Sequence, residues 1–368
     1  MGAWSLSNSG GIQTSMIRDS GYTFINVLPN LKSKPNIFIS DNYFYCMPTD
    51  NSNMLKVLED FPHQCRIALE LTKGMTISGK IDKVVVAGMG GSAVGGDLLK
   101  AYMHNSKVPV FVVRDYKVPN FVDENTLVFA VSYSGNTEET IAAFEDAFNK
   151  KAKIVAVTSG GQLGVMAKKV IKIPSGLQPR AALGYLFFPM LGVLANSGIV
   201  DVKGKEIEEM LDILSKTDDF KTVGERIAKK IGLRTPLIYS SELFGTVAYR
   251  WKTQFNENSK VAAFHHVFSE MSHNEIAGYQ NINKSDFIAI FIRDAQDNER
   301  IKLRMDATKE IISSRVDVEE IFTRGDGMLS RMLSGIYYGD FASYYLALAN
   351  RVDPTPVTVI ENLKKKLK

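Results

Sequence analysis

Cysteine is scarce in this chain, and no metal-ligand pattern accompanies the few histidines. The 368 residues contain two cysteines, Cys46 and Cys65, and five histidines. Two thiols cannot build a disulfide framework, and free thiols are typical of a reducing cytoplasm, which we expect here. His63 precedes Cys65 closely, but no second pair of cysteines or histidines completes a zinc motif. His265 and His266 stand as a pair without a carboxylate at ligand spacing, so no metal site is predicted.

Long uninterrupted apolar runs are missing as well. A membrane-spanning helix needs about 20 apolar residues, whereas the longest stretch, from Ala181 to Val200, is broken by glycines, Pro189 and Asn196. This stretch indicates a buried helix instead. The N-terminus has no basic segment ahead of an apolar one, so no secretory signal is expected. The sequence therefore predicts a protein that neither enters nor crosses a membrane.

A strong net charge is the third absence. The formal charge is +4 and is spread along the chain, which argues against nucleic acid as a partner. The terminal run Lys364-Lys365-Lys366 is more typical of the solvated face of a last helix than of a basic tail. With 45% hydrophobic and 23% charged residues, the composition is that of a globular protein long enough for two domains.

The first part of the chain differs in composition from the rest. Residues 1–53 are rich in Ser, Asn, Gly and Pro and show no sustained period, so we expect an N-terminal extension of uncertain order. From Met54 onward, short apolar runs alternate with helical patterns. This alternation predicts an α/β fold, in which helices cover both faces of a parallel sheet.

The alternation occurs twice and predicts two domains of similar topology, at residues 54–203 and 204–368. In the first we expect helices at about 54–74, 93–102, 138–148 and 181–198 and strands at about 83–88, 109–113, 126–132, 153–158 and 170–174. In the second we expect a charged helix at about 204–230, strands at 237–240, 260–263, 287–292 and 316–322, and helices ending at Phe255 and spanning 328–350.

Two expected strand-to-helix turns carry hydroxyl groups where a phosphate would bind. They are Gly88-Met89-Gly90-Gly91-Ser92 and Ser132-Tyr133-Ser134-Gly135-Asn136-Thr137. Free backbone N–H groups and the positive end of the helix dipole attract anions at a helix start. Glycine permits close approach of the backbone, and Ser or Thr adds neutral donors. Two such turns on nearby strands favour a pocket for a phosphorylated ligand.

The first turn has two other interpretations. It also satisfies the loose dinucleotide pattern G-x-G-x-x-A, with Asp115 about 20 residues further on. Ser92, however, occupies the approach that a pyrophosphate would need, and Asp115 lies past the end of its strand. A purely structural turn is the remaining alternative.

Three further polar residues stand out by their position. Glu257 lies where a helix gives way to a loop, although negative charge is mildly unfavourable at a helix C-terminus. His273 is flanked by polar residues, unlike most core histidines. Arg180 opens the apolar helix and needs an anionic partner, either a carboxylate or a ligand. Each can be an ordinary solvated or paired residue, but together they supply a carboxylate, an imidazole and a cation.

At this point the motifs resemble a known family. The two hydroxyl-bearing turns look like the sugar isomerase (SIS) fold, which implies two SIS domains, each a parallel sheet flanked by helices. The segments Gln178-Pro179-Arg180-Ala181-Ala182, Phe255-Asn256-Glu257-Asn258-Ser259-Lys260 and Ser272-His273-Asn274-Glu275 together resemble the bifunctional phosphoglucose/phosphomannose isomerases. The resemblance runs from about residue 54 to the C-terminus.

The resemblance implies an enzyme that interconverts glucose 6-phosphate, mannose 6-phosphate and fructose 6-phosphate through a cis-enediol intermediate, without a metal or redox cofactor. It assigns the substrate phosphate to Gly91, Ser92, Ser132, Ser134 and Thr137.

The resemblance also assigns catalytic roles to four residues. Glu257 would be the base that moves a proton between C2 and C1, and Arg180 would stabilise the enediolate. His273, from the partner subunit of a homodimer, and a C-terminal lysine would assist ring opening. Lys364 is the preferred lysine because it follows the apolar Val359, Ile360 and Leu363 pattern, although its neighbours leave the register open.

Three other functions remain to be separated from this one. A non-catalytic SIS module that binds a sugar phosphate as a signal would give Glu257, Arg180 and His273 no task. A nicotinamide-dependent oxidoreductase would require dinucleotide binding at the first turn. A glucosamine-phosphate synthase that uses glutamine-derived ammonia needs an N-terminal nucleophile domain, for which residues 1–50 are too few.

Overall fold

The computed structural model describes residues 14–19, 22–27 and 50–367. The chain divides into a unit of residues 1–47 and a compact unit of residues 48–368. In the first unit, β1 (Thr14–Asp19) pairs with β2 (Tyr22–Val27) in antiparallel register, with Thr14 opposite Val27. No strand is expected here from the sequence pattern, although isoleucine, tyrosine, phenylalanine and valine in these segments favour strands. The rest of the expected extension lies outside the described residues, apart from residues 50–53.

The first domain of the second unit is built on a five-stranded parallel sheet with the order β4-β3-β5-β6-β7. Its strands are β3 (Lys83–Gly88), β4 (Val110–Val113), β5 (Thr126–Val131), β6 (Lys153–Thr158) and β7 (Val170–Lys172). All residues of β5 are buried, as expected for a strand with both faces covered. The five expected strands are confirmed to within two residues at their ends.

The helices of this domain are α1 (Met54–Glu59), α2 (Phe61–Glu70), α3 (Gly90–Tyr102), α4 (Glu138–Asn149), α5 (Gly161–Met166) and α6 (Leu183–Asn196). The single helix expected over 54–74 is two helices, because Pro62 lies in the first turn of α2 and cannot continue the hydrogen bonds of α1. The helix α6 packs against both α2 and α3, and nearly all of its residues are buried.

The second domain has a four-stranded parallel sheet with the order β11-β10-β8-β9. Its strands are β8 (Thr235–Ser240), β9 (Phe264–Val267), β10 (Phe287–Arg293) and β11 (Asp317–Phe322). The strand expected at 260–263 is wrong. Lys260 has a φ of 57°, outside the β region, and the side chain of Asn256 donates to the carbonyl of Val261 at 2.9 Å. This loop delays the strand to Phe264.

The helices of the second domain are α7 (Gly204–Ser215), α8 (Thr217–Ile231), α9 (Gly245–Glu257), α10 (Phe268–Met271), α11 (Glu299–Ile312), α12 (Met328–Ala349) and α13 (Thr358–Lys366). The charged helix expected over 204–230 is therefore two helices, and α11 was not expected. Two 3-10 turns, η2 (Pro179–Ala181) and η3 (Glu275–Asn281), complete the elements.

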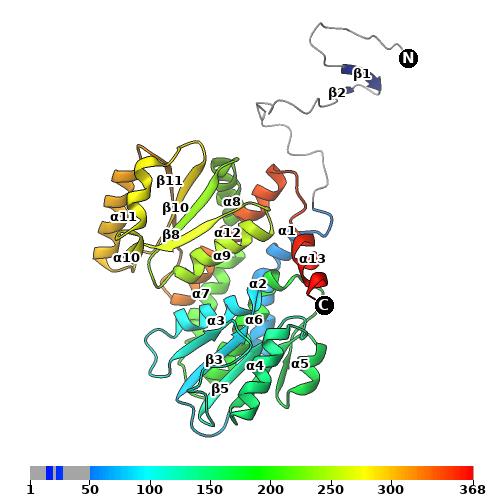
Figure 1. Cartoon of the computed structure of the whole chain (residues 1–368), viewed down its shortest axis with the longest axis vertical. Helices are drawn as coiled ribbons and strands as arrows, with labels where there is room; N and C mark the ends of the chain where they lie inside the picture. The colour runs from blue at the N-terminus through cyan, green and yellow to red at the C-terminus, as the bar shows by residue number, and fades with distance from the viewer. Residues whose placement is uncertain (1–13, 20–21, 28–49, 368) are drawn as a thin grey trace. The chain divides into compact units, whose positions relative to one another are not determined.

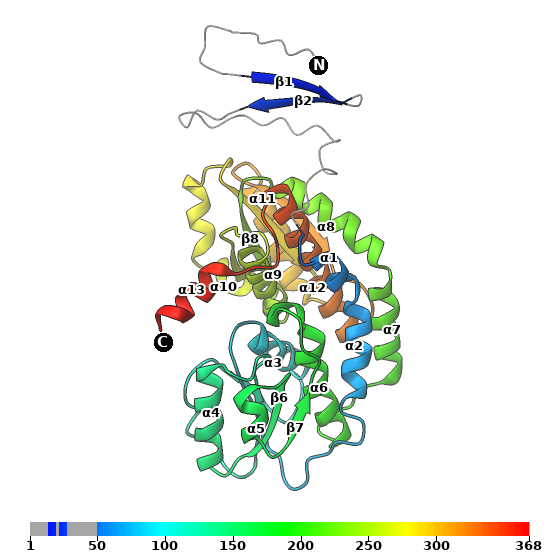
Figure 2. The ribbon, with the colours of Figure 1, turned by 90° about the vertical axis from the view of Figure 1, so that its right-hand side faces the viewer.

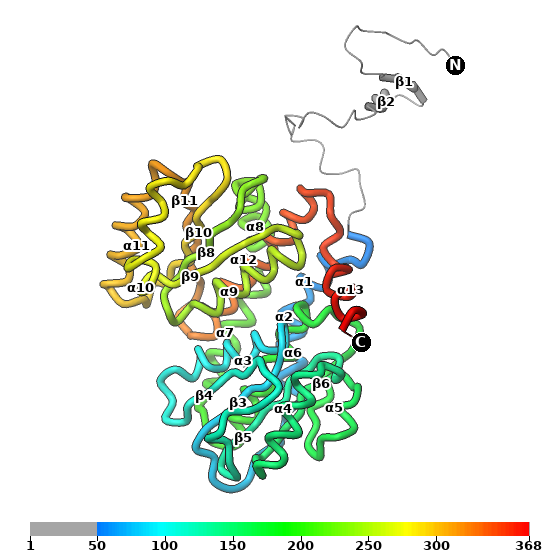
Figure 3. The backbone as a smooth tube through the Cα atoms, in the orientation of Figure 1, coloured from blue at the N-terminus to red at the C-terminus, as the bar shows by residue number. Residues whose placement is uncertain are grey.

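The largest hydrophobic cluster contains residues of both domains. Figure 1 and Figure 3 show the helices α7, α9 and α12 of the second domain next to the first. The helix α12 is buried on all sides because α7, α8 and α9 pack around it. Figure 2 shows α7 running beside α2, so the second domain also packs against a helix that precedes the first sheet. Of the helices that the structure describes, none combines the length and the apolar character needed to cross a membrane.

Candidate active site

The two hydroxyl-bearing turns lie side by side at the carboxyl edge of the first sheet. Because β3 pairs with β5, Gly88 is opposite Val131 and each turn starts from a neighbouring strand. The backbone N–H of Tyr133 donates to Oγ of Ser92 at 3.2 Å, which ties the second turn to the first. Ligands of open parallel α/β sheets bind at this edge, so the turns form one candidate anion-binding edge.

Hydrogen bonds within the second turn fix its shape. Oγ of Ser132 lies 2.9 Å from Oγ1 of Thr137 and accepts the N–H of Gly135 at 3.1 Å. Gly135 has a φ of 70°, and a Cβ built on it would lie 1.8 Å from the carbonyl oxygen of Gly160, so only glycine fits. Ser132 is fully buried, whereas Ser134 is exposed and Thr137 is half-buried at the start of α4.

The arginine selected from the sequence packs directly on the first turn. A Cβ built on Gly91 would lie 2.9 Å from both Cα and N of Arg180, so glycine is required for η2 to approach α3. Tyr133 adds a second connection, because its hydroxyl donates to the Pro174 carbonyl at 3.0 Å and accepts from the N–H of Leu177 at 2.9 Å. The segment that leads to Arg180 is thus attached to both turns.

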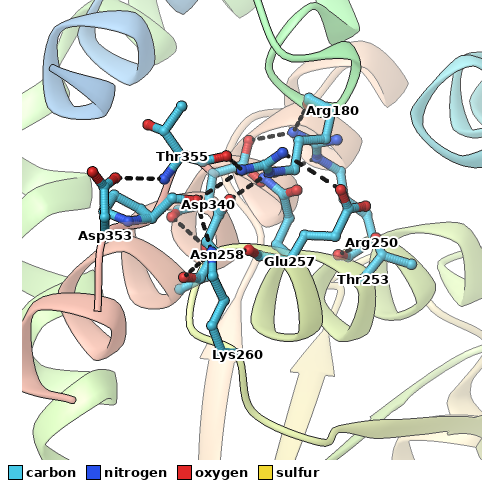
Figure 4. A network of polar contacts seen from close by, with 12 residues as sticks. Arg180, Arg250, Thr253, Glu257, Asn258, Lys260, Asp340, Asp353 and Thr355 are labelled. Carbon is cyan, nitrogen blue, oxygen red and sulfur yellow. Dashed lines mark hydrogen bonds and ion pairs between the residues drawn. The ribbon is translucent and has the colours of Figure 1, made fainter. Parts of the chain in front are cut away.

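Arg180 is buried, with 3% of its surface exposed, and bridges the two domains (Figure 4). Its Nε donates to Oδ1 of Asn258 at 2.6 Å, and its Nη2 donates to the carbonyls of Pro354 at 2.7 Å and Thr355 at 2.8 Å. Nη1 lies 3.5 Å from Oε2 of Glu257. Burial lowers the pKa of the Arg180 guanidinium, and the Glu257 carboxylate opposes that shift.

Glu257 is the last residue of α9, and about a quarter of its side chain is exposed (25%). The negative end of the helix dipole disfavours a carboxylate there, and Arg180 offsets this by facing it. At 3.5 Å the contact is at the long limit for a hydrogen bond, so the carboxylate is oriented by the guanidinium while part of it stays accessible. The structure therefore brings together a carboxylate and a cation that lie 77 residues apart in the sequence.

Three residues beside this pair were not selected from the sequence as site residues. Asn258 is buried and also donates from Nδ2 to Oγ of Ser343 at 3.0 Å. Pro354 and Thr355 contribute backbone carbonyls, and Oγ1 of Thr355 is a buried atom with no hydrogen-bond partner among the described residues. Asn258 could have been found because it follows Glu257 in the quoted motif. The carbonyl contacts of residues 354 and 355 have no residue-type signal.

A buried ion pair between Arg250 and Asp340 lies next to Arg180 and Glu257 (Figure 4). Arg250 on α9 binds Asp340 on α12 through two hydrogen bonds, Nε to Oδ1 at 3.0 Å and Nη2 to Oδ2 at 2.7 Å. The same Nη2 donates to the carbonyl of Arg180 at 3.0 Å. Burial raises the pKa of Asp340, and the Arg250 guanidinium opposes that shift. The turn that carries Arg180 is therefore anchored to the core of the second domain.

The structure does not bring His273 into contact with Arg180 or Glu257. Its side chain is exposed between α10 and η3, and the imidazole has no hydrogen bond or ion pair with any residue that the structure describes. Glu275, two residues further on, accepts a hydrogen bond from the hydroxyl of Tyr239, which is itself 2.6 Å from the hydroxyl of Tyr279. The loop is therefore anchored while the imidazole faces outward.

Lys364 likewise remains outside the site in this single chain. It lies on α13, where no residue is buried, and its side chain is exposed. Val359 and Leu363 on the same helix are also exposed, at 84% and 57%. The four catalytic candidates thus separate into one pair in contact, Arg180 and Glu257, and two exposed groups.

The comparisons with known proteins bear on the fold and the family of the chain. Residues 79–185 match the SIS domain family, and residues 220–367 match the family described as the bacterial phospho-glucose isomerase C-terminal SIS domain. In fold, the chain is similar to the C-terminal domain of glucosamine-fructose-6-phosphate aminotransferase from Francisella tularensis, with a TM-score of 0.63, 15% identity, and coverage of 83% of this chain and 98% of the other. The expected pair of SIS domains is confirmed.

Two relatives carry the same name as the family proposed from the motifs. The bifunctional phosphoglucose/phosphomannose isomerase of Caldicellulosiruptor bescii is 43% identical, over 85% of this chain and 98% of the relative. That of Thermoplasma acidophilum is 42% identical, over 88% of this chain and 98% of the relative. This chain therefore belongs to the family of bifunctional phosphoglucose/phosphomannose isomerases.

Proposed function

We propose that this protein is an aldose-ketose isomerase that interconverts glucose 6-phosphate and fructose 6-phosphate, and mannose 6-phosphate and fructose 6-phosphate. The names of its relatives support these substrates. The observation that carries the proposal is the contact between Glu257 and the buried Arg180, because it sets a base beside a cation. The free, buried thiol of Cys65 fits the reducing cytoplasm in which hexose phosphates are metabolised.

The first domain, residues 54–203, would bind the substrate phosphate. The donors are the hydroxyls of Ser92, Ser132, Ser134 and Thr137, with Gly91 allowing the backbone to come close. Phosphate contacts lie away from the reacting carbons, so their binding energy can position the opened sugar. The exposure of Ser134 and the place of Thr137 at the start of α4 support direct contacts from these two.

The second domain, residues 204–368, would supply the base. Glu257 removes the proton on C2 of the open-chain aldose, the C2–H electron pair forms the C1–C2 double bond, and the carbonyl pair moves onto O1. Arg180 stabilises the resulting cis-enediolate. A proton then moves from O2 to O1, the O2 electron pair forms the C2 carbonyl, and the electron pair of the C1–C2 double bond takes the proton back from Glu257 onto C1, which gives the ketose. A positioned base typically contributes about 10²–10⁴-fold, and a preorganised cation contributes a comparable share.

Ring opening requires further groups that a single chain does not bring to the pair. His273 and Lys364 are both exposed, which supports their supply across a subunit contact in a homodimer. The exposed apolar residues Val359 and Leu363 on the helix of Lys364 are consistent with a surface that another chain covers.

A coupled assay tests the proposal. Purified protein is offered glucose, mannose and fructose 6-phosphates separately, with and without a chelator. We expect interconversion of all three that chelation does not change. Tight binding of these phosphates without turnover would instead identify a non-catalytic SIS module. Reduction of a nicotinamide by this protein when the coupling enzymes are left out would identify an oxidoreductase.

A further inference from the structure

Lys260 lies beside Arg180 and Glu257, just after the end of α9. Its Nζ donates to the carbonyl of Glu257 at 2.6 Å, to that of Asn258 at 3.3 Å and to that of Pro354 at 3.3 Å. The ammonium has three N–H donors, so all of them are directed at backbone carbonyls. Two of these carbonyls belong to the end of α9, and the third belongs to the segment that precedes α13.

The backbone at this residue is unfavourable for lysine. Lys260 has a φ of 57°, in the left-handed region that glycine adopts freely and other residues rarely do. Such a conformation persists only where surrounding contacts hold it, and it concentrates at functional sites. The three carbonyl contacts of Nζ are interactions that glycine could not make.

The ammonium is also close to charged groups of the site (Figure 4). Arg180, Asp353 and Glu257 are the charged groups that face it, and Arg180 shares the Pro354 carbonyl with it. Desolvation and the Arg180 charge lower the pKa of Lys260 to about 8. The guanidinium of Arg180 and the ammonium of Lys260 thus bind the same carbonyl of Pro354, although their like charges repel each other.

We propose that Lys260 is a positioning residue of this site: by binding the end of α9 to residue 354, it holds Glu257 at its distance from Arg180. Lys260 binds the backbone carbonyls of Glu257 and Asn258. The side chain of Glu257 is the proposed base, and the side chain of Asn258 accepts the hydrogen bond from Nε of Arg180. The Pro354 carbonyl belongs to the segment that also receives Arg180 Nη2. One side chain therefore fixes both members of the pair relative to each other. The inference rests on the proposed function.

The decisive variant is Lys260→Gly, which removes the ammonium and relieves the backbone. Because glycine accepts the positive φ, we expect the melting temperature to stay close to that of the wild type. We expect kcat to fall about tenfold or more while KM for fructose 6-phosphate stays within about twofold, since the phosphate turns are untouched. The matched control is Lys252→Met, a lysine within α9, which should leave both constants unchanged.

Lys260→Arg separates charge from geometry. Arginine keeps its proton throughout the accessible pH range, whereas Lys260 loses its own near pH 8. We expect kcat of the wild type to fall above that pH. In Lys260→Arg this fall of kcat at alkaline pH (the alkaline limb of the pH profile) should be absent, and the variant should regain part of the activity that Lys260→Gly loses. A crystal structure of Lys260→Gly should show a longer separation between Oε2 of Glu257 and Nη1 of Arg180.

Three results would overturn the inference. They are a folded Lys260→Gly variant with wild-type kcat, a rise in KM alone, and an alkaline limb that persists unchanged in Lys260→Arg. A wild-type protein inactive on all three hexose phosphates would refute the proposed function instead. The crystallographic distance would then still decide whether Lys260 positions the pair.

Discussion

Replacing Glu257 by glutamine removes the proposed base and almost nothing else. The amide has the shape of the carboxylate, and its oxygen can still accept the hydrogen bond from Nη1 of Arg180 at 3.5 Å. Arg180 keeps its bonds to Asn258, Pro354 and Thr355, so the buried guanidinium is not left unpartnered. The site should therefore stay folded and keep its affinity for hexose 6-phosphates.

The expected loss is catalytic. A general base contributes about 10²–10⁴-fold, which corresponds to about 2.7 to 5.4 kcal/mol of transition-state stabilisation at about 1.36 kcal/mol per tenfold. The stability cost should be much smaller, because the lost ion pair is long and the Glu257 side chain is a quarter exposed (25%). We therefore predict a fall of at least about 10² in kcat with a nearly unchanged KM.

The assay measures both directions of the reaction under saturating substrate, together with the melting temperature. Glu145→Gln, an exposed carboxylate on α4, is the matched control and should behave as wild type. If Glu257→Gln kept more than a few per cent of wild-type kcat, Glu257 would not be the base, and the mechanism derived from its contact with Arg180 would fail.

Three further substitutions test the proposed phosphate contact, the packing of Arg180 on the first turn, and the buried ion pair beside the site. Ser134→Ala should chiefly raise KM, and a large fall in kcat at constant KM would contradict a phosphate contact. Gly91→Ala should lower kcat by displacing Arg180, whose Cα lies 2.9 Å from the added Cβ; an unchanged kcat would refute this packing argument. Arg250→Met should cost about 3–5 kcal/mol in urea unfolding, because it leaves Asp340 buried without its partner. Burial raises the pKa of Asp340, so the folded variant binds its proton more readily and this loss should shrink as the pH falls toward 4. A pH-independent loss would argue against the charge of Asp340 as its cause.

The sheet of the first domain could be predicted because its strands are continuous apolar runs between helices. The proximity of Ser92 and Ser132 followed from the same pattern, since both turns start from parallel strands. The strand before Phe264 was misplaced because Val261, Ala262 and Ala263 are apolar, while the side chain of Asn256 keeps them in a loop. Such a contact between a side chain and a backbone carbonyl leaves no periodic signal.

The residues of the candidate site could be predicted only in part from the sequence, for a different reason. The motifs selected Arg180 and Glu257, and the structure brings these two together. The acceptors that hold Arg180 at residues 354 and 355 are backbone carbonyls, which every residue has, so composition cannot indicate them. For His273 and Lys364, sequence spacing cannot say which chain supplies a side chain, and their roles stay predictions.

The donors of Arg180 have a consequence for selectivity. A guanidinium has five N–H groups, and within the described part of the chain four of them are directed at Asn258, Pro354, Thr355 and Glu257. One N–H, on Nη1, is left to meet a ligand. Such an arginine cannot grip a phosphate through two parallel bonds, as arginines in anion clamps do. It can serve a single oxygen atom, so under the proposed function the hexose phosphate would enter with its phosphate directed elsewhere and one hydroxyl or carbonyl oxygen presented to this donor.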